Sequence, residues 1–126
     1  MKKVLLDTDV LIDELRQPEK ETIYKTLKAQ KYKLYVCAIT VTELWAGESI
    51  TKPKGKRLVS KILKEVSIVL LSNQILRRAG EKLRKNKNLY LADAMVAATA
   101  LIKKLPLVTL NIRHFQHIKG LKLYTP

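Results

Sequence analysis

Apolar residues along the chain follow two spacings, and these predict alternating strands and helices. Short, nearly continuous apolar runs are typical of strands that are buried on both faces. Four such runs occupy residues 4–6, 33–39, 67–71 and 107–110, and a weaker one occupies residues 121–125. We therefore expect a sheet of four or five strands.

Between these runs, apolar residues recur at the three- and four-residue spacing of amphipathic helices. This spacing predicts helices over residues 8–15, 18–30, 40–49, 56–66, 73–87 and 89–102. Thr40 and Ser72 are suited to N-cap the third and the fifth of them. Pro18 and Pro106 mark helix boundaries, and residues 51–55, TKPKG, are expected to form a basic turn.

Strands that alternate with helices are typical of the α/β class, in which a mainly parallel sheet lies between two layers of helices. A chain of 126 residues has the length of one domain, so we expect a single domain over residues 1–126. Right-handed crossovers gather the ends of several strands at one edge of the sheet. Ligands of such folds bind in the crevice beyond the carboxyl ends of the strands.

The composition is strongly basic: the chain has 25 Lys and Arg and only 11 Asp and Glu, which gives a formal net charge of +14. This favours a polyanionic partner, either nucleic acid or an anionic membrane. No apolar run reaches the roughly 18 residues of a membrane span, because Asp93 interrupts the longest candidate, and the apolar stretch before Asp7 is too short for a signal peptide. Cys37 is alone, so no internal disulfide is expected and a reducing cytoplasm fits.

Three acidic residues fall where this topology gathers the strand ends. Asp7 follows the first strand, Glu43 lies in the first turn after the second strand, and Asp93 lies near the start of the helix before the fourth strand. Asn111 follows the fourth strand. Each acid also has a simpler interpretation: an N-cap for Asp7, a capping box of Glu43 with Thr40, and a favourable helix-dipole position for Asp93. Their coincidence at one edge of an acid-poor chain favours a shared site.

Carboxylates crowded at one site repel each other and require a cation. Oxygen ligands of this kind suit Mg²⁺ or Mn²⁺, whereas His114, His117 and Cys37 do not have the spacing of a zinc site. In a basic protein, a metal held by carboxylates points to phosphodiester chemistry. The metal activates a water and stabilises charge on the phosphate, while lysines and arginines hold the backbone.

Four segments in this order resemble the PIN-domain ribonucleases, and within them the VapC-type toxins of toxin–antitoxin pairs. They are LLDTDVLIDEL at residues 5–15, TVTELWAGE at 40–48, LADAMVAATA at 91–100 and LVTLNIRHFQHIKGLKL at 107–123. The resemblance covers nearly the whole chain and implies a three-layer sandwich with a mainly parallel four- or five-stranded sheet. It also implies Mg²⁺- or Mn²⁺-dependent cleavage of RNA, with tRNA or another structured RNA as the expected substrate.

The resemblance carries the family's acidic metal ligands onto Asp7, Glu43 and Asp93. Many relatives have a fourth acid at the place of Asn111 or of His114, and this chain has neither. Asn111 is therefore expected to act through its amide oxygen or to hold a water, with Thr109 orienting it. Asp9 occupies a position where relatives often have Asn or Ser, and we expect it to support the site.

The mechanism implied is in-line attack of a metal-activated water on a phosphodiester, leaving 5′-phosphate and 3′-hydroxyl ends. Asp7 and Asp93 are expected to carry the metal, and Glu43 to complete its shell. The resemblance further implies a homodimer and a cognate VapB-type antitoxin, a small DNA-binding protein whose C-terminal part lies in the active-site groove.

Two other functions fit parts of the sequence. A phosphohydrolase of the haloacid dehalogenase type also begins with a strand ending in D-x-D, with Asp7 as its nucleophile, but it needs a later lysine and a paired acidic motif, and LADA offers one Asp. A non-catalytic nucleic-acid-binding module is compatible with the charge of +14. Such a module gives the arrangement of Asp7, Glu43 and Asp93 no role.

Overall fold

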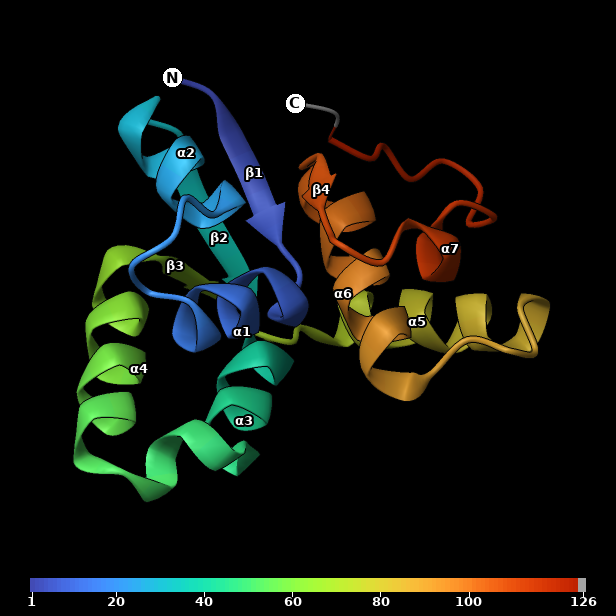
Figure 1. Ribbon diagram of the computed structural model, residues 1–126. Coiled ribbons are helices and arrows are strands. Elements are labelled where there is room, and N and C mark those ends of the chain that lie inside the picture. The colour runs from blue at the N-terminus through green and yellow to red at the C-terminus, as the bar shows by residue number, and fades with distance from the viewer. Residues whose placement is uncertain (125–126) are drawn as a thin grey trace.

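The computed structural model describes residues 1–124 and contains a four-stranded sheet in which every neighbouring pair is parallel, in the order β3-β2-β1-β4 (Figure 1). The strands are β1 (Lys3–Leu6), β2 (Lys33–Cys37), β3 (Ser67–Val69) and β4 (Leu107–Val108). The helices are α1 (Thr8–Arg16), α2 (Ile23–Ala29), α3 (Ala38–Ala46), α4 (Pro53–Glu65), α5 (Asn73–Lys85), α6 (Leu91–Lys103) and α7 (Ile112–Phe115), with a 3₁₀ helix, η1 (Glu48–Thr51), between α3 and α4.

Helices cover both faces of the sheet because successive strand side chains point to opposite faces. Val4 and Leu6 of β1 pack in one apolar cluster with residues of α1, α2, α3 and α4. Leu5, between them, packs in a second cluster with residues of α6 and α7. All three side chains are buried. The predicted α/β class and three-layer sandwich are thus confirmed, with four strands.

Of the four or five strands expected, four form, and residues 121–124 make no strand. An isolated parallel bridge joins Leu107 to Leu123 there, and residue 125 lies outside the described residues. The bridge does not extend, because β4 itself consists of Leu107 and Val108. Within residues 1–124, no helix is long and apolar enough to cross a membrane.

Three predicted helix starts are also wrong. The helix predicted from residue 18 begins at Ile23, where the Thr22 hydroxyl caps it by accepting a hydrogen bond from the Lys25 amide at 3.2 Å. Cys37, not Thr40, is the N-cap of α3. The expected basic turn does not form, because Thr51 ends η1 and α4 already begins at Pro53, a residue suited to the first helical position. Ser72 caps α5 as predicted.

Candidate functional site

The sequence-predicted residues lie around the carboxyl ends of β1, β2 and β4. Asp7 directly follows β1, and Glu43 lies on α3, which continues from β2 without a loop. Asp93 lies in the first turn of α6 and Asn111 is the N-cap residue of α7, after β4. Figure 1 shows these segments, the end of β1 and the starts of α1, α6 and α7, in one region of the molecule.

Asp7 is buried, and each of its carboxylate oxygens accepts a hydrogen bond. It is the N-cap of α1, with Oδ1 accepting a hydrogen bond from the Thr8 amide at 2.9 Å. Its Oδ2 accepts one from the Thr109 hydroxyl at 2.8 Å. Burial raises the pKa of Asp7 to about 7, and the negative charges of Asp9 and Asp93 add to this rise, against the hydrogen bonds from Thr109 and Thr8. The N-cap interpretation is therefore correct, and it coexists with a crowded acidic environment.

Asp9 connects the start of α1 to the segment after β4. Its carboxylate accepts hydrogen bonds from the Leu110 amide, at 3.2 Å to Oδ2, and from the Thr109 hydroxyl, also at 3.2 Å. Burial raises the pKa of Asp9, while these hydrogen bonds oppose the rise. Asp9 lies close enough to Asp7 for its charge to raise the pKa of Asp7. The contacts of Asp9 with Thr109 and Leu110 fix the β4–α7 segment to the site.

Glu43 is held by a threonine rather than by a capping box. Its Oε1 accepts a hydrogen bond of 2.5 Å from the Thr8 hydroxyl, which also lies 2.8 Å from the hydroxyl of Thr40. Because the amide of Thr8 bonds to Asp7, this one residue links the two carboxylates. No sequence signal singled out Thr8, since a threonine at the start of a helix is commonplace.

Asp93 is partly buried and contacts a histidine. Its Oδ2 lies 3.0 Å from Nδ1 of His114, and Nδ2 of Asn111 lies 3.0 Å from the same ring nitrogen. Burial raises the pKa of Asp93, and the contact with His114 counteracts this rise. The backbone amide of Asn111 also donates to the Thr109 hydroxyl at 3.0 Å. Asn111 thus joins the site through His114.

The donor set fits a hard divalent cation. The charges of Asp9 and Asp93 raise the pKa of Asp7, and the charge of Asp93 raises that of Asp9, and a cation relieves this repulsion. All their donors are oxygens, the ligands that Mg²⁺ and Mn²⁺ prefer. Within residues 1–124, no three acidic, histidine or cysteine side chains already enclose a common point, so the carboxylates would have to close onto the ion.

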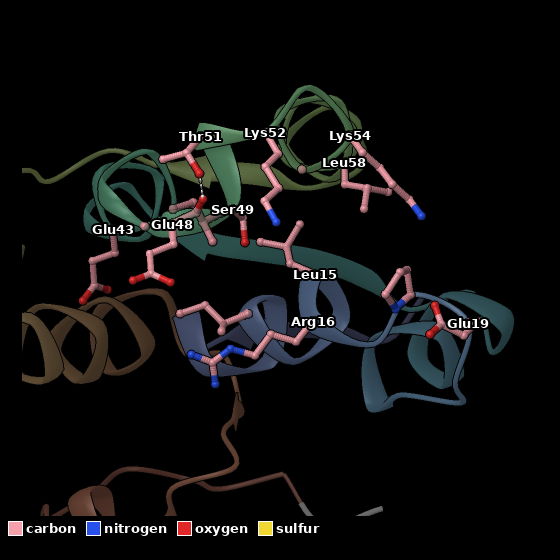
Figure 2. Close-up of a pocket in the computed structure, with 15 residues that line it drawn as sticks. Leu15, Arg16, Glu19, Glu43, Glu48, Ser49, Thr51, Lys52, Lys54 and Leu58 are labelled. Carbon is pink, nitrogen blue, oxygen red and sulfur yellow. Dashed lines mark hydrogen bonds between the residues drawn. The ribbon is translucent and has the colours of Figure 1, made fainter.

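A large hollow of about 920 Å³ adjoins the site on the side of Glu43. Figure 2 shows it between α1 on one side and α3, η1 and the start of α4 on the other. Its wall contains both charges and apolar side chains: Arg16, Glu43, Glu48, Lys52, Leu15 and Leu58. Its size and mixed wall are suited to a peptide or a nucleotide segment.

The comparisons with known proteins agree with one another. Residues 4–121 match the model of the PIN domain family. Ribonuclease VapC1 of Methanocaldococcus jannaschii is 33% identical over 128 residues, covering 97% of this chain and 87% of that protein. Ribonuclease VapC10 of Mycobacterium tuberculosis is 29% identical over 123 residues, covering 94% and 90%.

Solved structures of similar fold include toxin–antitoxin complexes. A chain of VapBC2 from Rickettsia felis, bound to a DNA fragment from its promoter, superimposes with a TM-score of 0.82 at 21% identity, covering 97% of both chains. A chain of a toxin–antitoxin complex from Klebsiella pneumoniae gives a TM-score of 0.78 at 28% identity, covering 98% of this chain and 97% of the other.

Proposed function

This chain belongs to the PIN-domain family, and we propose that it is a metal-dependent endoribonuclease, the toxin of a VapBC-type toxin–antitoxin pair. The observation that carries the proposal is the buried carboxyl of Asp7, whose pKa is raised to about 7 beside Asp9 and Asp93 at the carboxyl edge of the sheet. Relatives named as ribonucleases match nearly the whole chain. The proposed substrate is tRNA or another structured RNA.

Asp7 and Asp93 would hold the metal, with Glu43 completing its shell. When bound, Mg²⁺ or Mn²⁺ supplies Lewis-acid chemistry, which makes a nucleophile available at neutral pH and offsets charge on the attacked phosphate. The reaction is hydrolysis: an oxygen of water forms a bond to phosphorus, the bond to O3′ breaks, and 5′-phosphate and 3′-hydroxyl ends result. Asn111, a weaker member of this set, would act through its amide oxygen.

The chain's own residues anchor individual members of this donor set before any ligand binds. Thr8 fixes Asp7 through its amide and Glu43 through its hydroxyl. Asp9 anchors the segment that carries Thr109 and Asn111, and His114 contacts Asp93 from α7. These contacts restrict the rotamers of the carboxylates, so that less ordering is left when they close onto the ion.

We also propose a VapB-type antitoxin partner, a homodimer and a cytoplasmic location. Solved proteins of this fold include complexes of a toxin with its antitoxin, which supports the partner. The C-terminal part of the antitoxin would lie in the hollow beside Glu43, where apolar residues such as Leu15 and Leu58 alternate with charged ones. Of the two rival functions, the haloacid dehalogenase type does not agree with the family, and a pure binding module leaves the raised pKa of Asp7 without a role.

The test is cleavage of total tRNA and a panel of structured RNAs by purified protein, with Mg²⁺, with Mn²⁺ and with a chelator. We expect cleavage with either metal and none with chelator. Asp93→Asn should lower the rate by more than about 100-fold, the equivalent of about 3 kcal/mol of barrier. Glu48→Gln is the matched control, because Glu48 lines the hollow beside Glu43 but lies outside the proposed donor set.

Mapping the product ends completes this test. The proposal predicts 5′-phosphate and 3′-hydroxyl ends at a limited number of sites. Metal-independent cleavage, or equal rates for the wild type and Asp93→Asn, would contradict it. A folded wild type that binds these RNAs without cleaving any of them in either metal would support the binding module instead.

A further inference from the structure

The outer face of α4 is a row of exposed positive charges. The inner face of this helix buries Val59 and Ile62 in the core. Five exposed cations lie along the rest of the helix: Lys54, Lys56, Arg57, Lys61 and Lys64. Arg57, Lys61 and Lys64 follow the four- and three-residue spacing that stacks side chains on one side of a helix, one turn or about 5.4 Å apart.

None of these cations forms a salt bridge within residues 1–124, although the charge of Lys61 lowers the pKa of nearby Glu65. The only acid of α4 is Glu65, which already bonds to Lys28 at 2.5 Å and to the Tyr24 hydroxyl at 2.8 Å. In the described part of the chain, residues 1–124, none of the five cations lies within 4.0 Å of a carboxylate. On α5, in contrast, Glu81 lies 3.8 Å from Lys85 and 4.0 Å from Lys82.

The face is hollowed and polar. A shallow depression of about 560 Å³ runs along it, lined by Pro53, Lys56, Arg57, Ser60, Lys61 and Lys64. Only Pro53 among these is apolar, so the face has no side chain that would insert into the interior of a membrane. Its chemistry suits a partner that presents repeated negative charges in water, which is the property of a nucleic-acid backbone.

The helix that carries this face also forms part of the wall of the hollow beside the candidate catalytic site. Lys52 and Lys54, at the start of α4, line the hollow that contains Glu43. Figure 2 shows Lys52 directed into this hollow, with Lys54 farther along the same helix. A polyanion lying in the hollow therefore meets positive charge in the direction of α4.

We propose that the α4 basic face, formed by Lys56, Arg57, Lys61 and Lys64, binds the phosphate backbone of RNA outside the cleavage site. The identity of the polyanion as RNA rests on the proposed function. Bound there, a structured RNA gains affinity from contacts that a short fragment around the scissile bond does not reach. Selection of structured over minimal substrates then depends on α4 as well as on the carboxylate site.

The test compares two triple variants that each remove three positive charges. The first is Lys56→Gln, Arg57→Gln, Lys64→Gln on α4. The second, Arg77→Gln, Arg84→Gln, Lys87→Gln, changes exposed residues on and just beyond α5. Binding of a fluorescent tRNA is measured by anisotropy with chelator present, from 50 to 300 mM salt, so that no cleavage occurs.

We expect the α4 variant to bind at least about tenfold more weakly at low salt, with the slope of log K against log salt reduced by roughly 2 to 3, the scale of 0.7 to 0.9 per lost phosphate contact. The α5 variant should retain nearly the wild-type slope. Cleavage of a short fragment by the α4 variant, measured with Mg²⁺, should stay within about twofold of wild type.

Equal losses in the two variants would overturn the proposal, because they would show a general effect of net charge. An unchanged slope for RNA binding by the α4 variant would also overturn the proposal. The same holds if the α4 variant keeps its binding of RNA and loses only its binding to anionic vesicles or acidic peptides. The binding comparison decides this question even if the wild type cleaves no RNA, so its failure is distinct from failure of the proposed ribonuclease activity.

Discussion

Asp7 meets two requirements at once, as the N-cap of α1 and as the most buried of the three crowded carboxyls. A helix N-terminus favours negative charge at this position, whereas burial and the charges of Asp9 and Asp93 disfavour it. In the absence of a cation the second influence prevails, since the pKa of Asp7 is raised to about 7. The protonation of Asp7 at neutral pH is therefore expected to depend on whether a cation occupies the site.

This imbalance predicts a pH dependence of stability in chelator. The folded pKa of Asp7, about 7, lies above its ordinary value of 3.8, so the folded state binds the proton more tightly than the unfolded state. The stabilisation is fully present below about pH 4 and is lost as the pH rises through about 7. We expect the Tm of the chelated wild type to fall between pH 5 and pH 8 by more than that of Asp7→Asn.

Addition of Mg²⁺ at pH 8 should raise the Tm of the wild type and leave that of Asp7→Asn nearly unchanged, because a ligand that binds only the folded state stabilises it. Thermal melts at both pH values, with and without metal, measure both effects. Identical pH dependence of the Tm in the two proteins would show that the pKa of Asp7 is not raised in the folded protein.

At the same scale, the sequence predicts the acids better than their partners. Asp7, Glu43 and Asp93 are singled out because each stands at the predicted end of a strand or start of a helix, and Asp7 and Asp93 also stand beside apolar residues. The contacts of Thr8 with Glu43 and of His114 with Asp93 join residues from different elements. A single sequence holds no signal for such pairs, because their distances depend on how α3, α6 and α7 dock.

Among the elements, the corner between η1 and α4 depends on one glycine. A Cβ added to Gly55 would lie 1.9 Å from the carbonyl oxygen of Ser49 and 2.8 Å from its carbonyl carbon, and backbone atoms cannot yield as a flexible side chain does. The corner forms one wall of the hollow beside Glu43, since Ser49 and Gly55 both line it. The glycine thus shapes a surface proposed to receive a partner.

Gly55→Ala is therefore expected to destabilise the fold by about 1 to 3 kcal/mol, the usual cost of overpacking, although alanine is the better helix former. Gly80→Ala on α5 is the matched control, because nothing lies within 4 Å of the added Cβ there. It should stabilise the protein by about 0.5 to 1 kcal/mol. Urea unfolding of both variants measures the two signs, and a Gly55→Ala variant as stable as wild type would refute the close approach.

Two helix boundaries show where local sequence patterns fail to predict the structure. The helix predicted from Thr40 begins at Ala38, because the hydroxyl of Thr40 lies against that of Thr8 instead of capping the helix. The basic segment at residues 51–55 reads as a turn from its proline and glycine. In the structure, the proline begins α4 and the glycine permits contact with η1. Both errors arise from tertiary contacts that override local preference.

For the whole molecule, alternation of strands and helices was sufficient to predict a parallel sheet between two helical layers, and the order of the motifs was sufficient to predict the family. The direction of the strands then placed Asp7, Glu43, Asp93 and Asn111 around one edge. The sequence marks basic segments such as residues 51–55, but a net charge of +14 does not state which faces of the folded protein carry the positive charge. The structure locates an unpaired part of it on α4.

The central claim is that Asp7 and Asp93 hold a divalent cation, and binding of Mn²⁺ followed by electron paramagnetic resonance tests it most directly. The free ion gives a strong six-line signal, which weakens on binding. The account predicts that the wild type depletes this signal and that Asp7→Asn and Asp93→Asn do not, while Asp13→Asn, an acid farther along α1, depletes it as the wild type does. Equal depletion by all four proteins would contradict the account.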